Sequence, residues 1–408
     1  MRPRMALLSL FVLSAVYPPH VCADVVAIKA GRIVPVATEE IADGIIVIRD
    51  GKIAQIDKDI RIPDGATVLD ATGKVVMPGL VDASAVSPVR GDLNEQSEEI
   101  TPSLRISKAI DPDHKGLKRM VQEGVTALYV SPGRENVIGG LGAVIKPAGT
   151  TIEDMLLRQD AGLAAVLSMD AAYGNRIPRC EPARNFYYRR PTTRMAIIWM
   201  LQQAFSQAKQ NPSGQAEKQG QEVLEAVLEG DIPVRLNVRR AINIRTALKM
   251  ADEYGFELIL DECTEGYKVA DEIAQGGASA VLGPFYYYPQ DYRQAREGRE
   301  VNWNNAGILA KAGVQVALSS GMTSESVDLL TAARFAVRHG MPRKTAVEAV
   351  TIIPARLLGV DDRIGSIEKG KDADLLILNG EPLTLTTRVE TVIIDGRTVH
   401  RADSGEKP

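Results

Sequence analysis

The chain has 408 residues with 48 basic and 52 acidic side chains, which gives a formal net charge of −4. The chain therefore lacks the basic excess that is typical of proteins binding nucleic acid or anionic lipid, which argues against both of these functions. Three cysteines without a CxxC spacing exclude a disulfide-rich scaffold and a cysteine-based metal motif. Two of them, Cys180 and Cys263, lie in the body of the chain and either pair in an oxidising compartment or stay free.

The first 23 residues predict a secretory signal peptide. Arg2 and Arg4 form a short basic start, residues 5–17 are mostly apolar, and small residues precede the expected cleavage before Asp24. The apolar run is short for a membrane span, and no later stretch is long and apolar enough to cross a membrane. An uncleaved anchor or a buried N-terminal helix is the alternative. We expect a secreted or periplasmic protein with a net charge of −6, because cleavage removes two arginines.

Both ends of the remaining chain predict short β-strands. Residues 24–77 contain apolar runs separated by glycine turns, with a hairpin signal at Asp50-Gly51. Residues 365–408 repeat this texture, with a second hairpin signal at Asp395-Gly396. We expect the two ends to form one small composite β-sandwich domain.

The middle of the chain, residues 78–364, alternates short apolar strands with amphipathic helical stretches. About eight strand–helix units predict an α/β fold, a closed parallel (β/α)8 TIM-like barrel. Any site should then lie at the C-terminal ends of its strands. The expected strands are residues 74–85, 125–130, 143–146, 164–169, 234–238, 257–260, 279–282 and 314–318.

The first barrel strand carries a recognisable motif. Residues 76–86 read Val-Met-Pro-Gly-Leu-Val-Asp-Ala-Ser-Ala-Val. They resemble the opening motif of the amidohydrolase superfamily, in which Pro-Gly, two apolar residues and Asp precede His-x-His. Residues 361–375 resemble the return of that family into its small domain. The segments 94–96, 136–140 and 264–268 resemble its imidazolonepropionase-like branch, so the resemblance covers nearly the whole chain after residue 23.

This resemblance implies a metal site whose ligands are replaced here. In the family, histidines, a lysine and an aspartate at the strand ends hold a divalent ion that activates water. Valine and glycine cannot coordinate a metal, and serine and asparagine are weak neutral ligands. We therefore interpret the chain as a pseudoenzyme without a metal or other cofactor. The positions that match the family's ligands hold Ser84, Val86, Ser168, Asn237, Arg239, Glu262 and Gly321.

The histidine count gives the same prediction without an alignment. Of four histidines, His20 is removed with the signal peptide. His114 lies in a predicted turn, His339 ends a predicted helix, and His400 lies in the last predicted strand. No two share the spacing of metal ligands, so a histidine-based metal site is disfavoured.

Two arrangements are open for the charged residues at the replaced positions. Arg239 and Glu262 belong to neighbouring strands and can form an ion pair in place of the metal, because a lone buried charge is costly. Alternatively, Arg239 turns away and pairs with Asp261 or Glu265. A calcium site at Glu262 and Asp261 is disfavoured because Arg239 would repel the ion. Asp261 is also expected to point away, since neighbouring strand residues alternate faces.

Lys146 is a candidate pocket residue with two catalytic interpretations. It could carry a carboxylate bridge between metals, or act as the base for Ser84 or Ser168 in a Ser–Lys dyad. A nucleophile needs a base that a third group orients, and no histidine is near, so small pocket-lining side chains are favoured over a catalytic set. The remaining nucleophile candidates are Ser319, Ser320 and Cys263.

Two segments expected on the C-terminal face of the barrel are rich in aromatic residues and arginine. Residues 185–191 and 285–293 hold eight of the 19 aromatic residues. Such clusters are favoured at binding surfaces. We expect them to line a ligand or protein contact or to plug the mouth; a lid packed on its own barrel is the alternative. The candidate contact residues are Tyr187, Tyr188, Arg190, Tyr286, Tyr287 and Tyr288.

Together these features predict an exported amidohydrolase-like protein without metal-dependent hydrolysis. It would bind an unknown small ligand or a protein partner, such as an active homologue, in a homo- or hetero-oligomer, and it would not bind nucleic acid. One alternative is a hydrolase of carbon–nitrogen bonds in non-peptide or dipeptide amides, acting through an atypical site. Another is a structural envelope protein. The choice depends on the site, because one fold supports many functions.

Overall fold

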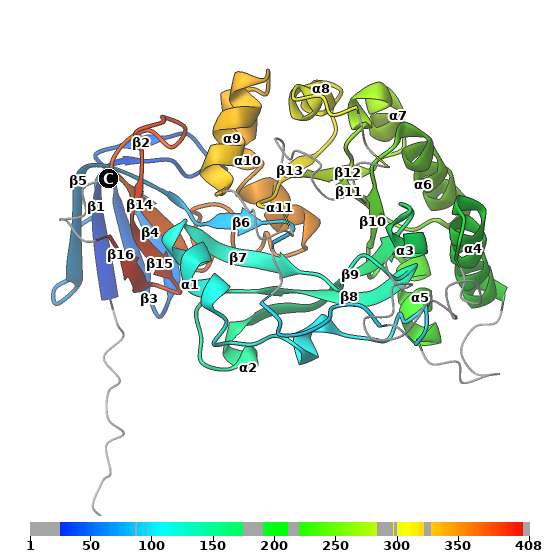
Figure 1. Cartoon of the computed structure of the whole chain (residues 1–408). Coiled ribbons are helices and arrows are strands. Elements are labelled where there is room, and N and C mark those ends of the chain that lie inside the picture. The colour runs from blue at the N-terminus through cyan, green and yellow to red at the C-terminus, as the bar shows by residue number, and fades with distance from the viewer. Residues whose placement is uncertain are drawn as a thin grey trace, which may run out of the picture.

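The computed structural model describes residues 25–85, 88–95, 97–173, 191–210, 220–283, 297, 300–321 and 328–402. Its strands form two sheets that lie beside one another (Figure 1). We call them the small sheet, built from both chain ends, and the barrel sheet, built from the middle of the chain. Among the helices of the described ranges, none is long and apolar enough to cross a membrane.

The small sheet joins the two chain ends through β5. Its order is β16-β15-β14-β5-β1-β3-β4, with β2 paired to β1. Because β5 pairs with both β1 and β14, the ends form one continuous eight-stranded sheet, whereas the sequence predicted a two-layered sandwich. Its strands are β1 (Val25–Ile33), β2 (Ile41–Ala42), β3 (Ile45–Arg49), β4 (Lys52–Asp57), β5 (Thr67–Pro78), β14 (Leu375–Leu378), β15 (Val389–Ile394) and β16 (Arg397–Arg401).

The two predicted hairpin turns are present in the small sheet. Asp50-Gly51 joins β3 to β4 with φ values of 49° and 77°, and Asp395-Gly396 joins β15 to β16 with 48° and 73°. Both residues of each turn are left-handed, as a two-residue hairpin loop requires. Each Asp-Gly pair therefore fixes the register of its hairpin.

The barrel sheet is only partly the closed parallel barrel that the sequence predicted. Its order is β13-β12-β11-β10-β9-β8-β7-β6, and β8 runs antiparallel to both of its neighbours. Residues Ala349 and Val350 bridge its two edges by accepting the backbone N–H groups of Leu318 and Val81, at 2.8 and 2.9 Å. Its strands are β6 (Leu80–Asp82), β7 (Val125–Val130), β8 (Ile138–Ile145), β9 (Leu156–Val166), β10 (Val234–Val238), β11 (Leu258–Glu262), β12 (Ser279–Leu282) and β13 (Val316–Leu318).

Most helices of the described chain pack on the outside of the barrel sheet, and those from α4 to α8 follow one another along it from green to yellow (Figure 1). Inside the barrel, Ile352 and Ile353 of α11 share a buried apolar cluster with Ala83, Ile259 and Val281. The helices are α1 (Lys115–Gln122), α2 (Ile152–Met155), α3 (Asp170–Tyr173), α4 (Arg194–Gln210), α5 (Gln221–Glu229), α6 (Ala241–Tyr254), α7 (Ala270–Gln275), α8 (Asn305–Lys311), α9 (Leu329–Arg338), α10 (Arg343–Glu348) and α11 (Ile352–Leu357).

Lys146 forms ion pairs between the barrel sheet and the small sheet. The prediction that it lines the pocket is therefore wrong. Its ammonium is buried and lies 2.9 Å from a carboxylate oxygen of Asp372, 2.9 Å from Asp374 and 2.6 Å from Asp395. The physical reason is the direction of β8. Because this strand is antiparallel, the residue after its C-terminal end lies at the barrel end opposite the mouth. A Ser–Lys dyad or a bridged metal pair built on Lys146 is thereby contradicted.

Candidate functional site at the barrel mouth

The C-terminal ends of the parallel strands bring together most of the positions that the sequence singled out. Ser168 follows β9, Asn237 lies in β10, Arg239 directly follows β10, and Glu262 ends β11. Asn237 and Arg239 are 3% and 4% exposed. We call this region the mouth. Its described polar residues are Asp82, Ser84, Arg134, Ser168, Asp170, Arg235, Asn237, Arg239, Asp261, Glu262, Glu297, Ser319 and Ser320.

Arg239 is at the centre of the mouth. Its Nη2 donates to Oδ2 of Asp170 at 2.6 Å, and its Nε donates to the carboxylate of Glu262. Glu262 also pairs with the guanidinium of Arg134. The hypothesised pair between Arg239 and Glu262 is therefore present, and the alternative partners of Arg239 are not used.

Asp261 also faces the barrel interior, contrary to the sequence prediction. Its carboxylate accepts from Nη2 and Nε of Arg235 at 2.6 and 3.2 Å, and the Arg235 guanidinium carbon lies 3.8 Å from the centre of the Tyr129 ring. Consecutive residues of a regular strand point to opposite faces. Glu262 escapes this rule because its φ is 68°, a left-handed conformation that is rare outside glycine. Such strain often accompanies functional positions.

Two glycines make room for the buried Arg235. A Cβ on Gly162 would lie 2.9 Å from Cδ of Arg235, and one on Gly142 would lie 2.0 Å from the hydroxyl of Tyr129. Gly142 belongs to β8 and Gly162 to β9, and β9 is the direct neighbour of β10, the strand that carries Arg235. Three arginines and three carboxylates form the arginine network of the mouth: Arg134, Arg235, Arg239, Asp170, Asp261 and Glu262.

Two segments that carried the family resemblance position Arg134. The side-chain amide of Asn136 donates to the carbonyls of Glu95 and Glu98 at 2.6 and 2.7 Å, and Oδ1 of Asn94 accepts the N–H of Glu135 at 2.8 Å. On the other side of Arg134, the N–H of Gly133 donates to the carbonyl of Leu93 at 2.9 Å, so the loop after β7 is held on both sides of Arg134. Burial and the repulsion from Arg239 lower the pKa of Arg134 to about 10.

The third segment that carried the family resemblance, residues 264–268, positions Arg239. The N–H of Glu265 donates to the carbonyl of Arg239 at 2.8 Å, and Oε2 of Glu265 accepts the N–H of Ala241 at 3.0 Å. These bonds satisfy backbone groups at the start of α6. They hold the turn between β10 and α6, and with it the guanidinium that Arg239 directs into the mouth.

Sequence reasoning did not assign a role to Asp82 or to Glu297. Asp82 is fully buried and accepts from Oγ of Ser320 at 2.5 Å and from the N–H of Ser84 at 3.1 Å, so it ties the ends of β6 and β13 together. Burial raises the pKa of Asp82. Glu297 accepts the N–H of Met169 at 2.8 Å, and burial raises its pKa too. Asp82 was part of the first-strand motif, whereas nothing in the sequence marked Glu297.

The remaining predicted positions have mixed outcomes. Ser84 is buried beside Asp82, and Gly321 follows β13 with a φ of 89°. Cys263 is a buried free thiol, and burial raises its pKa to about 12, which makes it a poor nucleophile. Several predicted residues lie outside the described ranges: Val86, Cys180, Tyr187, Tyr188, Arg190, Tyr286, Tyr287 and Tyr288.

The side chains present at the mouth do not fit the divalent ion that the resemblance implies. The described histidines lie elsewhere: Nδ1 of His114 accepts the N–H of Gly116 at the start of α1, His339 packs on Phe335, and His400 lies in β16. Within the described ranges, no three histidine, cysteine or acidic residues are grouped as metal ligands. At the mouth, the carboxylates of Asp170 and Glu262 are already bridged by the guanidinium of Arg239.

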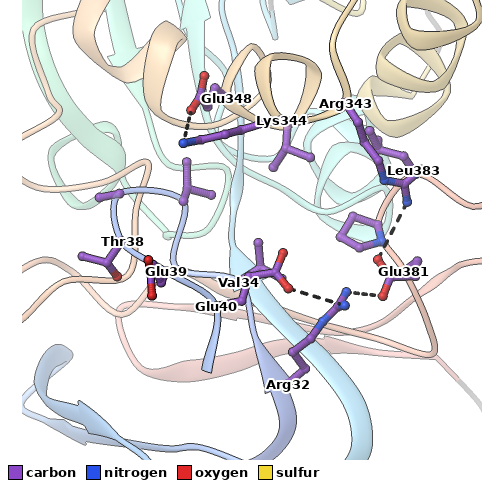
Figure 2. Close-up of a pocket in the computed structure, with 14 residues that line it drawn as sticks. Arg32, Val34, Thr38, Glu39, Glu40, Arg343, Lys344, Glu348, Glu381 and Leu383 are labelled. Carbon is purple, nitrogen blue, oxygen red and sulfur yellow. Dashed lines mark ion pairs between the residues drawn. The ribbon is translucent and has the colours of Figure 1, made fainter. Parts of the chain in front are cut away.

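A hollow lies between the small sheet and α10 (Figure 2). It encloses about 650 Å³, within the size range of small-molecule sites. Apolar side chains such as Val34 and Leu383 line it together with charged groups. Arg32 pairs with Glu40 at 3.5 Å and with Glu381 (Figure 2). The basic side chains that line this hollow are paired with neighbouring glutamates. None of the predicted site residues lines it, so we take the mouth as the candidate site.

Comparisons with known proteins agree with this architecture. The amidohydrolase family profile matches residues 258–399, from β11 into β16. A crystal structure of an amidohydrolase from Thermotoga maritima MSB8 superposes with a TM-score of 0.82 at 29% identity, over 92% of this chain and 100% of that one. The chain is similar to the amidohydrolases. The match includes both sheets, since it covers nearly the whole described chain.

Curated relatives carry amidohydrolase names as well. Amidohydrolase tasK of Hapsidospora irregularis is 25% identical over 86% of this chain, which spans 39% of that protein. The imidazolonepropionase of Thermoplasma acidophilum is 23% identical over 82% of each chain. This chain thus spans well under half of the first relative and most of the second. The relationship to this family supports a hydrolase-like protein.

Proposed function

We propose that this protein uses its amidohydrolase fold to bind a small polar ligand at the mouth, without metal-dependent hydrolysis. One observation carries the proposal. The buried guanidinium of Arg239 bridges Asp170 and Glu262 at the strand ends, where the family resemblance expects metal ligands. A fixed positive charge at that point repels a divalent cation and already neutralises the available carboxylates.

The electrostatics of the arginine network supports a binding role. Three guanidinium groups face three carboxylates, so the network supplies its own charge balance. Guanidinium groups and carboxylates held by neighbouring strands are rigid, directional hydrogen-bonding groups. Such a preorganised polar surface at the end of a barrel is suited to recognition of a small molecule. The export predicted from the N-terminus would place this binding protein in a periplasm or outside the cell.

The proposal is tested on the purified chain by elemental analysis and native mass spectrometry. We expect zinc, iron and manganese far below one atom per chain, unfolding that a chelator does not change, and no hydrolysis of N-acyl amino acids or dipeptides. We also expect a small molecule to remain associated in gentle ionisation. Stoichiometric metal together with chelator-sensitive amide hydrolysis would refute the proposal.

A further inference from the structure

Buried polar atoms without partners gather on the inner face of β10. Neither Oδ1 nor Nδ2 of Asn237 has a hydrogen-bond partner, although the residue is 3% exposed. The Nη1 atoms of Arg235 and Arg239 are also buried and without partners. Residues two apart on a strand point to the same side. These side chains therefore form one column of polar atoms with unused hydrogen-bonding capacity.

The end of β9 adds a fifth such atom. Oγ of Ser168 is buried and has no partner, and the neighbouring N–H of Leu167 donates to the carbonyl of Asn237 at 3.1 Å. Ser168 is thereby tied to the same level of the barrel as the β10 column. Buried polar atoms in native proteins nearly always have a partner, in the protein, in ordered water or in a ligand. Five at one end of the barrel indicate a binding site.

The kinds of atom define what the site can accept. The two guanidinium nitrogens and the amide nitrogen can only donate, Oδ1 of Asn237 can only accept, and the hydroxyl of Ser168 can do either. Donors therefore outnumber acceptors. The complement is a compact, flat group rich in acceptors, and a carboxylate with its two oxygens has this chemistry.

The charge around the site tolerates an added anion. The arginine network is balanced by itself. The other two buried acids of the mouth are Asp82 and Glu297, and burial raises the pKa of each, so their charged forms are disfavoured. A ligand carboxylate beside Arg235 and Arg239 would therefore face guanidinium groups with unused N–H donors and no excess of fixed negative charge.

We infer that Arg235, Asn237, Arg239 and Ser168 form a subsite for the carboxylate of a small organic acid. This inference rests on the proposed function and specifies its ligand class. The acid group would occupy the column of unpartnered atoms. The rest of the molecule would extend out of the mouth.

The test uses acetate and acetamide as matched probes, because they share a shape and differ in charge and donor number. Thermal unfolding and calorimetric titration of the purified chain are followed at constant ionic strength, with chloride as the balancing anion. We expect acetate to raise the unfolding midpoint in a saturable way, and acetamide to have little effect. Absence of a saturable acetate effect, which would mean that only ordered water fills the column, overturns the inference.

Two substitutions of Asn237 sharpen the result. Asn237→Leu removes both unpartnered amide atoms, so it should keep or raise the midpoint without ligand and weaken acetate binding at least about tenfold. Asn237→Asp keeps the shape and should abolish acetate binding by charge repulsion. An unchanged acetate affinity in both variants also contradicts the inference.

Asn305→Leu is the matched control on another buried asparagine. Its Nδ2 donates to the carbonyl of Cys263 at 2.9 Å, so this substitution should lower the midpoint and leave the acetate effect intact. If acetamide stabilises the chain as well as acetate does, the carboxylate class is wrong while ligand binding stands. Stoichiometric metal with chelator-sensitive hydrolysis would instead remove the proposed function itself.

Discussion

Replacing Lys146 by methionine should remove the central cation of the contact between the two sheets. Its ammonium lies within 2.9 Å of Asp372, Asp374 and Asp395. Asp372 keeps Lys52 at 2.8 Å and Arg363 at 2.6 Å. Asp395 is half exposed and can be hydrated.

Asp374 is the carboxylate that the Lys146→Met substitution leaves with the fewest partners. It is buried and would keep only the N–H of Asp395, at 2.9 Å, as a donor. One uncompensated buried charge costs about 3–5 kcal/mol, which is the expected loss in the free energy of unfolding at about pH 8. Chemical denaturation measures this loss. The exposed Lys52→Met is the control and should cost less than about 1 kcal/mol.

The pH dependence of the Lys146→Met variant tests the reasoning independently. Burial raises the pKa of Asp374 to about 6 even with Lys146 present. An acid whose pKa is raised by folding loses its contribution to stability as the pH rises through the folded pKa. Without Lys146 that pKa rises further, so the deficit of the variant should shrink between about pH 8 and about pH 5. A deficit that is constant with pH, or a Lys146→Met, Asp374→Asn double variant no more stable than the single one, would refute this account.

Three further predictions concern the mouth and the N-terminus. Arg239→Met leaves Asp170 and Glu262 without their shared cation, so it should lower the free energy of unfolding by about 3–5 kcal/mol, measured by chemical denaturation. Added magnesium should recover part of this loss in the variant and have no effect on the parent chain. Asp82→Ala should cost about 1–3 kcal/mol by the same measurement, because the N–H groups of Ser84 and Ser320 lose their acceptor, and a loss near zero would contradict the role of Asp82 in holding β6 to β13. Expression in a bacterium with a periplasm, followed by fractionation and N-terminal sequencing, should find a soluble periplasmic chain beginning near Asp24; a chain that keeps Met1 and stays with the membrane would contradict the predicted cleavage.

The order of residues along the chain was sufficient to predict the local features. The two Asp-Gly hairpins and the approximate places of the barrel strands depend on neighbours in sequence, and these were predictable. The pair between Arg239 and Glu262 was also predictable, because neighbouring parallel strands bring their ends together and a lone buried charge is costly.

Only the tertiary structure decided the direction of β8 and the partners of its residues. A strand of the same composition can run either way, so the sequence did not show that Lys146 would meet Asp374 at the far end of the barrel. The inward turn of Glu262 depends on a left-handed φ that its residue type does not favour.

The residues at the expected ligand positions could thus be read from the sequence alone, whereas the arginine network that forms at the mouth was decided by tertiary structure. Arg134 lies in the loop after β7 and Asp170 begins α3 after β9, and nothing in their local sequence marks them as partners of Glu262 and Arg239. Which buried charges meet depends on how the strand ends converge in space. A buried charge is stable only if such a partner arrives, so the network exists because the fold brings these distant residues together.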